Sequence, residues 1–316
     1  MRYNTDMAKK MTGSQAFETY YRTLFSSEAE YHQFMEALTS PKKPVLRFNP
    51  SNEKKLKNLW EKAGLEWKTL EWYPFAVLWP SDVPLDADLP GFSEHLFYTL
   101  NASSLIPVLA LNPQPGEMIL DACAAPGGKA LFIAEQLGES HTLVANDLSR
   151  KRRERMKQVF SDFSQKVAIW GMKAELVCKK APEQFDKVLL DAPCSSEAHV
   201  YTNKTELAKW SENRIRGLKK RQLGLLNGVW HALKPGGTLV YSTCAVTPEE
   251  NEWVVGAFLK KQKGKAQLLP WNLQDTPGNS GIPGEYPLSF ELVAVRRVMP
   301  NEQHSPMFIA VFTKIE

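Results

Sequence analysis

Two cysteines each end an apolar run typical of a buried strand. Cys194 ends VLLDAPC at residues 188–194, and Cys244 ends TLVYSTC at residues 238–244. A reactive thiolate is a nucleophile for covalent catalysis, whereas a buried structural cysteine is an inert, small apolar side chain. A third apolar run precedes the segment DACAAPGGK at residues 121–129. Because open α/β sheets bind ligands at the carboxyl ends of their strands, these segments predict a site for covalent chemistry at one sheet edge.

The glycine-rich segment is typical of a nucleotide-type ligand site. Pro126, Gly127 and Gly128 lie between a predicted strand and a predicted helix, where backbone N–H groups are free and no Cβ blocks a close ligand. Asp147 ends the next predicted strand, at a position where an acid suits the hydroxyls of a ribose. The chain lacks G-x-x-x-x-G-K-[ST] and a complete G-x-G-x-x-G, which disfavours a nucleoside triphosphatase and a nicotinamide dehydrogenase.

The elements that must position these residues alternate from about residue 116 onward. We predict a doubly wound parallel α/β sheet, because strands and helices follow one another with short connections. Two further strands are predicted at 290–298 and 307–314. The predicted parallel strands are 117–123, 141–147, 167–170, 185–191 and 237–243, and the predicted helices are 128–137, 149–161, 204–233 and 248–262.

The N-terminal part does not alternate strands and helices in this way, and its pattern predicts a small α+β module. Apolar spacing indicates helices at 14–38 and 51–64, with a strand at 44–49 between them. An aromatic-rich extended stretch at 67–80 follows, and the Pro- and Asp-rich residues 80–90 are interpreted as a linker.

Composition indicates an ordinary intracellular protein. Of 316 residues, 43% are hydrophobic and 23% charged, and the net charge is +4. Four cysteines without a CxxC pair or a Cys/His cluster predict neither a disulfide framework nor a metal site. Residues 1–10 lack the apolar core of a secretory signal, and no apolar run reaches the roughly 18 residues that a membrane span requires. We therefore expect a cytoplasmic protein.

Three long motifs resemble those of one enzyme family. DACAAPGGK, DAPCS at 191–195 and YSTC at 241–244, the last followed by PEENE at 248–252, resemble the Sun-family (NOL/NOP/Sun, Fmu-like) RNA cytosine-C5 methyltransferases. The segments ASSLIPVLAL and RRVMP extend the likeness from about residue 45 to the C-terminus. The resemblance implies a Rossmann-like class I methyltransferase domain at residues 113–316, ending in an antiparallel hairpin. It also implies an RNA-positioning module at residues 1–112, an RNA substrate, a monomer and S-adenosyl-L-methionine as cofactor.

The resemblance also implies roles for individual residues. Cys244 is the nucleophile that adds to C6 of cytosine, and Cys194 assists breakdown of the adduct. Asp191 contacts the N3/N4 edge of the base, and Lys129 lies near the reaction centre. The residues implied to bind the cofactor are Cys123, Ala124, Ala125, Pro126, Gly127, Gly128, Lys129, Asp147, Gly171 and Asp191. Cys123 and Cys178 are otherwise interpreted as small buried side chains.

The chain departs from the family pattern in three places. Gly171 stands where an acid near the adenine is expected. Leu100-Asn101, and SEAH at 196–199 in place of a glycine-containing continuation, are similar to a subgroup that includes a mitochondrial ribosomal RNA enzyme. Ribosomal RNA is therefore favoured over transfer RNA as the substrate.

Two alternatives remain open. DNA cytosine methylation would use a Pro-Cys nucleophile alone, and the presence of Cys244 argues against it. A non-catalytic RNA-binding or ribosome-assembly factor could retain the same fold.

Two basic runs, at 150–157 and 214–221, are either solvated helix faces or phosphate contacts. The four tryptophans between residues 60 and 79 are interpreted as packing residues rather than as RNA-stacking ones.

Overall fold

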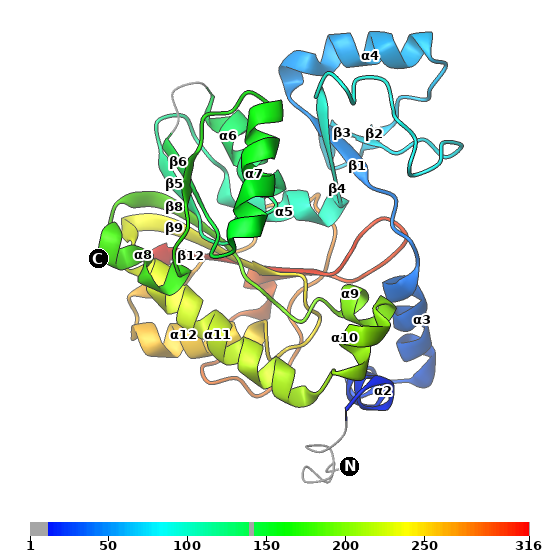
Figure 1. Ribbon diagram of the computed structural model, residues 1–316. Helices are drawn as coiled ribbons and strands as arrows, with labels where there is room; N and C mark the ends of the chain where they lie inside the picture. Colours follow the sequence, from blue (N-terminus) through cyan, green and yellow to red (C-terminus); the bar gives the residue numbers. More distant parts are fainter. Residues whose placement is uncertain (1–11, 139–141, 316) are drawn as a thin grey trace.

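The computed structural model describes residues 12–138 and 142–315, and it contains two β-sheets on which helices pack (Figure 1). The N-terminal stretch predicted not to be a secretory signal lies outside the described residues. Across the two described ranges, no helix is long and apolar enough to cross a membrane.

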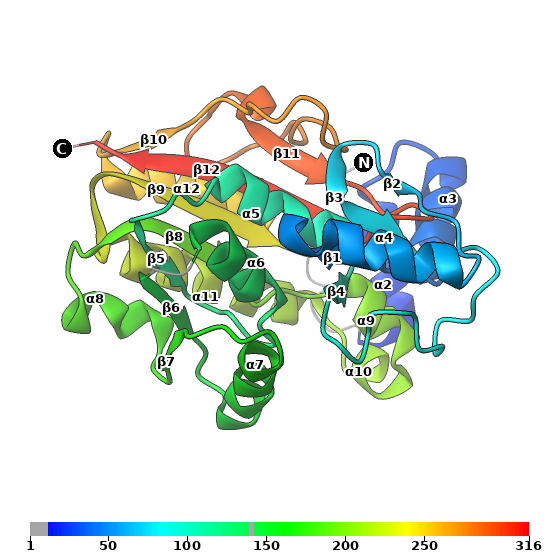
Figure 2. The ribbon, with the colours of Figure 1, turned by 90° about the horizontal axis from the view of Figure 1, so that it is seen from above.

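The larger sheet has the strand order β10-β12-β9-β8-β5-β6-β7, and β11 pairs with β12. The neighbouring strands β9, β8, β5, β6 and β7 run parallel to one another. Strand β12 is antiparallel to β9, β10 and β11 (Figure 2). The predicted α/β fold with an antiparallel C-terminal pair is confirmed. Its strands are β5 (Met118–Asp121), β6 (Thr142–Asn146), β7 (Ala168–Trp170), β8 (Phe185–Asp191), β9 (Leu233–Thr243), β10 (Ala266–Leu268), β11 (Val295–Val298) and β12 (Met307–Lys314).

Helices cover both faces of this sheet, which explains its almost uninterrupted apolar strands. Ile119 and Leu189 face a core shared with α5, α6 and α7, whereas Leu120 and Leu190 face a core shared with α8, α11 and α12. Successive side chains of a strand point to opposite faces, so both must be apolar when both faces are buried. These helices are α5 (Ile106–Leu111), α6 (Gly128–Leu137), α7 (Arg150–Asp162), α8 (Val177–Lys180), α11 (Glu212–Trp230) and α12 (Glu252–Gln262).

The smaller sheet is antiparallel, with the order β2-β3-β1-β4, and α4 packs on it. Trp60 and Trp79 are buried in its core, which supports their interpretation as packing residues. Leu89 is buried in the same core, so the predicted linker at 80–90 packs on the sheet. The elements are β1 (Val45–Phe48), η1 (Pro50–Asn52), α4 (Glu53–Lys62), β2 (Thr69–Leu70), β3 (Tyr73–Leu78), β4 (Phe97–Leu100) and η2 (Ala102–Leu105).

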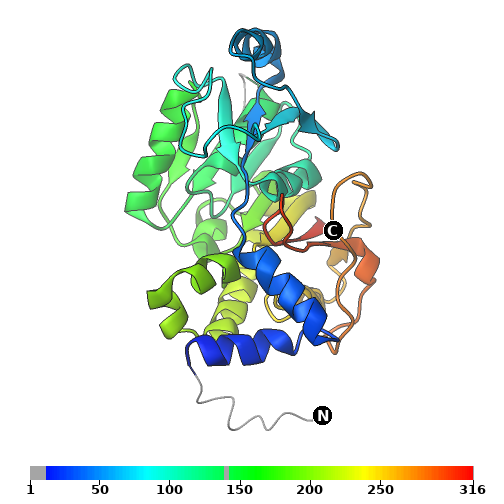
Figure 3. The same ribbon diagram turned by 90° about the vertical axis from the view of Figure 1, so that its right-hand side faces the viewer.

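The first two described helices, α2 (Ser14–Arg22) and α3 (Glu28–Thr39), pack away from the smaller sheet. Figures 1 and 3 show them beside α9 (Glu197–Thr202) and α10 (Lys204–Ala208), at the other end of the molecule from α4. Phe17 and Tyr21 of α2 contact the buried ring of Trp210, which follows α10. The N-terminal helices therefore contact the segment that follows Cys194.

Three predicted elements are interrupted. The helix predicted at 14–38 is two helices, because Ser27 accepts the N–H of Glu30 and starts a new helix there. The helix predicted at 204–233 breaks after α10, with Ser211 preceding α11. The strand predicted at 290–298 begins as the 3-10 turn η4 (Leu292–Ala294), and another such turn, η3 (Ala174–Leu176), precedes α8. At the first of these breaks the Ser27 side-chain hydrogen bond competes with helix continuation, which apolar periodicity alone does not reveal.

Candidate functional site

Cys194 and Cys244 lie in contact at the carboxyl edge of the larger sheet. β8 and β9 are parallel neighbours with Asp191 opposite Ser242, so the loops that follow them start side by side. The two sulfur atoms are 2.8 Å apart, and both thiols are free and partly exposed. The structure thus brings together two cysteines that the sequence places at separate strand ends.

The surroundings of Cys194 favour the protonated form of its thiol. The hydrogen bond with the Cys244 sulfur, burial, and the negative charges of Glu250 and Glu197 raise the pKa of the Cys194 thiol well above its ordinary value. A thiol with a raised pKa keeps its proton and donates a hydrogen bond rather than attacking as a thiolate. Cys194 therefore has a proton to donate, and its sulfur lies within hydrogen-bond distance of the Cys244 sulfur.

Asp191, the last residue of β8, is held from two sides. Lys129 Nζ donates to its Oδ2 at 2.7 Å, and Ser242 Oγ donates to its Oδ1 at 2.8 Å. Burial alone would lower the pKa of Lys129, but the charge and hydrogen bond of Asp191 and the charge of Asp121 raise it overall. Lys129 is therefore a fixed positive charge, and the carboxylate of Asp191 is fixed in orientation.

A cavity of about 260 Å³ opens beside this ion pair. Tyr98 and Ser104 line one side of it, although they come from the N-terminal part of the chain. A Cβ at position 128 would come within 2.6 Å of the Tyr98 ring, so the close approach requires Gly128. The predicted cofactor residues that line this cavity are Cys123, Ala124, Ala125, Pro126, Gly128, Lys129 and Asp191.

Asp121 also lines the cavity, although no role for it was predicted from the sequence. Its carboxylate oxygens are buried, and neither has a hydrogen-bond partner among the described residues. Burial and the charge of Asp191 raise its pKa to about 7. A buried carboxylate without a partner is unfavourable unless a ligand supplies one. Its place at a strand end, directly before the glycine-rich segment, is the signal that could have identified it.

Three predicted cofactor residues do not line this cavity: Asp147 and Gly171 directly follow the neighbouring strands β6 and β7, and Gly127 lies between β5 and α6. Asp147 is buried, accepts the N–H of Ser149 at 2.8 Å and pairs with Arg152 at 3.2 Å. At Gly171 an added Cβ would come within 2.6 Å of the Arg153 guanidinium carbon. A guanidinium therefore lies beside the position where the family pattern has an acid. Gly127, with φ +116°, packs against Met156 of α7, and its N-cap position starts α6.

Cys123 and Cys178 have surroundings typical of structural cysteines. Burial and the nearby charges of Asp121, Asp147 and Asp191 raise the pKa of the Cys123 thiol far above its ordinary range. The sulfur of Cys178 donates to the backbone carbonyl of Glu175 at 3.9 Å. The Cys123 thiol is therefore a poor nucleophile in this fold.

Two buried glutamates, Glu197 and Glu250, lie behind the Cys194 loop and are not among the site residues predicted from the sequence. Ser195 contacts both, because its N–H donates to Glu250 Oε2 at 3.0 Å and its Oγ donates to Glu197 Oε1 at 2.7 Å. Gln222 Nε2 also donates to Glu250, and the Tyr21 hydroxyl donates to Glu197 at 2.9 Å. Burial and the charge of Glu197 raise the pKa of Glu250 to about 7. These carboxyl groups hold the backbone that carries Cys194.

The Glu250 carboxyl should make stability depend on pH. Its pKa is 4.5 when unperturbed and about 7 in the fold, so between these values the unfolded chain releases the proton first. Stability therefore falls as pH rises through this window. We expect the free energy of unfolding to drop by about 2 kcal/mol between pH 5 and pH 8 because of this group. Urea unfolding of wild type and Glu250→Gln at both pH values measures it.

The exposed Glu285 supplies a control for this measurement. Glu285→Gln should keep the pH dependence of the wild type, whereas Glu250→Gln should lose about 2 kcal/mol of it and keep the part that the raised pKa of Asp121 contributes. Equal pH dependence in Glu250→Gln and wild type would show that the carboxyl of Glu250 titrates alike in the folded and unfolded chain.

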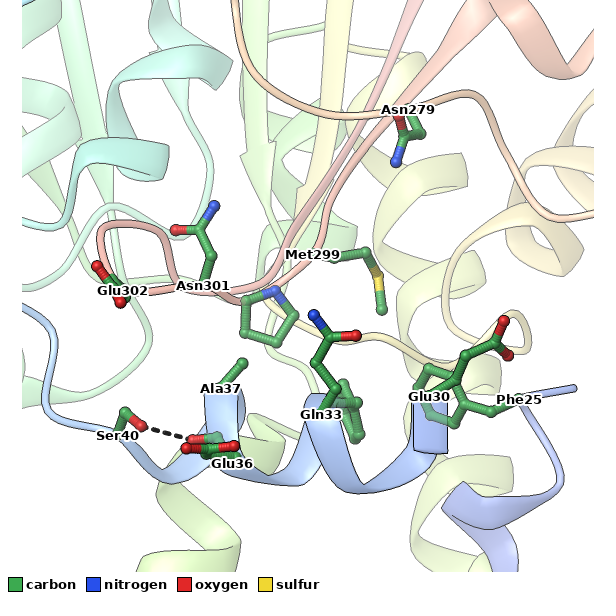
Figure 4. Close-up of a pocket in the computed structure, with 12 residues that line it drawn as sticks. Phe25, Glu30, Gln33, Glu36, Ala37, Ser40, Asn279, Met299, Asn301 and Glu302 are labelled. Atoms are coloured by element: carbon green, nitrogen blue, oxygen red, sulfur yellow. Dashed lines mark hydrogen bonds between the residues drawn. The ribbon is translucent and has the colours of Figure 1, made fainter. Parts of the chain in front are cut away.

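Figure 4 shows a larger cavity, of about 730 Å³, between α3 and the loop at residues 299–302. Glu30, Glu36 and Glu302 contribute to its lining, together with apolar groups such as Met299. None of the site residues predicted from the sequence lines it. Acidic side chains repel phosphate groups, so this cavity does not suit a nucleic-acid backbone.

Comparison with protein families matches residues 108–313 to the family described as 16S rRNA methyltransferase RsmB/F. The chain is 38% identical over 229 residues to ribosomal RNA small subunit methyltransferase B of Salmonella arizonae, covering 72% of this chain and 52% of that protein. Ribosomal RNA small subunit methyltransferase F of Klebsiella pneumoniae is 38% identical over 58% of this chain and 39% of its own length. The chain therefore spans about half the length of the curated relatives it matches, or less.

Two solved structures from Pyrococcus horikoshii have a similar fold. A methyltransferase homolog superimposes with a TM-score of 0.75 at 28% identity, covering 96% of this chain and 100% of that one. NSun6, solved with SFG, superimposes with a TM-score of 0.76 at 21% identity, covering 95% of this chain and 97% of that one.

Proposed function

Because the chain belongs to the 16S rRNA methyltransferase RsmB/F family, we propose that it transfers a methyl group from S-adenosyl-L-methionine to C5 of a cytosine in RNA, with ribosomal RNA favoured. The observation that carries the proposal is the contact between the sulfurs of Cys194 and Cys244 beside the Lys129–Asp191 ion pair. A non-catalytic RNA-binding factor would need neither the paired thiols nor the fixed charges.

The cavity beside Lys129 fits the cofactor. Asp121 presents a buried carboxylate without a partner, which suits the ammonium group of the methionine part. Residues 123–126, 128 and 129 line the same space, and Asp147 follows the next strand, where it would meet the ribose. When bound, the cofactor supplies an electrophilic methyl group on its sulfonium.

Cys244 carries the covalent step. After its thiol proton passes to water, the Cys244 sulfur forms a bond to C6, and the electron pair of the C5–C6 double bond moves toward C5 and the N3 side of the base. C5 thereby becomes nucleophilic enough to accept a methyl group. The ammonium of Lys129 stabilises the charge that develops on the ring, and the Asp191 carboxylate accepts a hydrogen bond from the N4 amino group.

Cys194 assists release. After methylation, C5 loses its proton to water, the C5–C6 double bond forms again, and the C6–S bond breaks with its electron pair on the Cys244 sulfur. The Cys194 thiol lies 2.8 Å from that sulfur and donates to it as it leaves. Its raised pKa keeps the donor proton in place.

The basic helix faces suit the RNA backbone. Arg150, Lys151 and Arg155 of α7 and Lys220 and Arg221 of α11 are exposed. Each phosphate contact from such side chains makes binding weaker at higher salt. Because a paired base cannot reach the cysteines, the target cytosine must be unpaired or flipped out of its helix. Residues 1–112 would position the RNA, since Tyr98 already reaches the cavity.

Bisulfite sequencing tests the proposed activity. RNA from cells that express the protein, compared with RNA from cells that lack it, should contain one or more cytosines that resist conversion. The purified protein should transfer labelled methyl groups to small-subunit ribosomal RNA, and transfer RNA and DNA of matched sequence serve as controls. If no cytosine in any RNA gains protection and no label is transferred, the proposed activity is wrong.

Asp121 supplies a prediction about cofactor binding. With a pKa of about 7, its carboxyl is half protonated at pH 7 in the free protein, and an ammonium group nearby would favour the carboxylate. Binding of S-adenosylhomocysteine at pH 7 should therefore release about 0.5 proton. Titration calorimetry in phosphate and in Tris measures the release, because the two buffers have different heats of ionisation.

The Asp121→Asn variant should release no proton from this site and bind about tenfold or more weakly, since a hydrogen bond to a charged group is lost. Asp275→Asn, at an exposed position, should behave as wild type. Identical binding heats in both buffers for the wild type would contradict the role given to Asp121.

A further inference from the structure

Ser196 has a backbone conformation that is unfavourable for its residue type. Its φ of +51° and ψ of +58° lie in the left-handed region, which glycine tolerates and serine enters at a cost. This is the position where the sequence departs from a glycine-containing continuation after Pro-Cys-Ser. A serine in this strained backbone conformation is expected to make a side-chain interaction that glycine could not make.

The hydroxyl of Ser196 lies against both cysteines. Its Oγ is 3.2 Å from the sulfur of Cys244 and 3.6 Å from the sulfur of Cys194. The backbone holds it there, because the N–H of Val200 donates to the Ser196 carbonyl at 3.0 Å. On the other side, the preceding Ser195 is anchored to the two buried glutamates. The left-handed conformation therefore directs a hydroxyl at the reacting sulfur.

We propose that Ser196 is a further catalytic residue, whose hydroxyl donates a hydrogen bond to the Cys244 sulfur and stabilises it as a thiolate. The inference rests on the proposed function, in which Cys244 attacks C6 and later leaves it. In both steps the negative charge sits on this sulfur, first before the S–C6 bond forms and again after that bond breaks. Two donors then face the thiolate, the Cys194 thiol and the Ser196 hydroxyl.

Thiol alkylation tests the hydrogen bond without RNA. The full-length protein is treated with iodoacetamide over a range of pH, and the peptide that contains Cys244 is quantified by mass spectrometry. Removing one hydrogen bond to a charged sulfur should move the midpoint of this curve up by about one pH unit and slow alkylation at pH 7 about tenfold. We expect this in both Ser196→Ala and Ser196→Gly.

The two variants separate the hydroxyl from the backbone strain. Alanine keeps the unfavourable conformation and glycine relieves it, but both lack the hydroxyl. A shift in the alanine variant alone would assign the effect to strain and overturn the inference. Because glycine suits this conformation, at least one variant retains the fold. Ser211→Ala is the control, since the Ser211 side chain makes no capping hydrogen bond to α11.

Methylation assays complete the test. Both Ser196 variants should lose about tenfold in kcat, with KM for the cofactor unchanged, if the lost interaction stabilises charge in the chemical steps. Alkylation curves that coincide with that of the wild type would reject the role of Ser196, whether or not the wild type methylates RNA. Shifted curves in a protein that methylates no RNA would instead reject the proposed function and leave the Ser196–Cys244 hydrogen bond in place.

Discussion

The Cys244→Ala variant is expected to form neither methylated cytosine nor a covalent complex with RNA. Without a nucleophile at C6, C5 of cytosine is not reactive enough to take a methyl group, so the rate should fall by at least about 10³-fold. Cys194 cannot replace it, because burial and the negative charges of Glu250 and Glu197 still raise its pKa when the hydrogen bond with Cys244 is gone. Binding of S-adenosylhomocysteine should be unchanged, since Cys244 is not among the residues that line the cofactor cavity.

This expectation is measured by transfer of labelled methyl groups and by a denaturing gel that reveals an RNA–protein complex. Cys178→Ala is the matched control, because that thiol contacts only the carbonyl of Glu175 among the hydrogen-bond partners found in the described residues. If the Cys244→Ala variant still formed a covalent complex, another residue would be the nucleophile.

The position of the cysteine pair follows from a pattern that is visible in the sequence. Cys194 and Cys244 each come after an apolar run, and parallel strands place such residues at one edge of the sheet. What the sequence does not contain is the strand order. Only because β8 and β9 are neighbours, with Asp191 opposite Ser242, do the two sulfurs come into contact.

The glutamates behind the loop could not be predicted, for a related physical reason. Ser195 and Glu250 are 55 positions apart and meet through tertiary packing. A charged residue in a sequence is ordinarily read as exposed, whereas Glu197 and Glu250 are almost completely buried. Burial of charge becomes tolerable here because hydrogen bonds from Ser195, Gln222 and Tyr21 reach the carboxyl groups, and local sequence does not encode those contacts.

The interruption of the helix predicted at 14–38 has a local cause that apolar spacing hides. Periodicity at 14–38 is correct for both α2 and α3, and only the capping serine at position 27 marks the boundary. This boundary matters for the site, because it lets α2 place Tyr21 against Glu197 while α3 takes another direction. The role of Gly171 stays a prediction. The guanidinium of Arg153 beside it was not predicted from the sequence.

The Cys194→Ala variant is expected to accumulate the covalent complex that Cys244→Ala lacks. Cys244 keeps the Ser196 hydroxyl as a partner and still attacks C6, so the first methyl transfer proceeds. Release slows, because the thiol that donates to the leaving sulfur from 2.8 Å is gone. Loss of such a donor to a developing charge lowers a rate by about 10²-fold, so turnover should nearly stop after one methyl group per protein molecule.

Rapid-quench kinetics with labelled cofactor separates the two phases. Wild type should show steady turnover, and Cys194→Ala should show a burst of one methyl group with an RNA–protein complex that resists denaturant. Cys194→Ser retains a hydroxyl donor at this position and should release product faster than the alanine variant. The double variant with Cys244→Ala should form no complex. A Cys194→Ala protein that turns over at the wild-type rate, or that traps RNA without Cys244, would show that the two thiols do not divide attack and release between them.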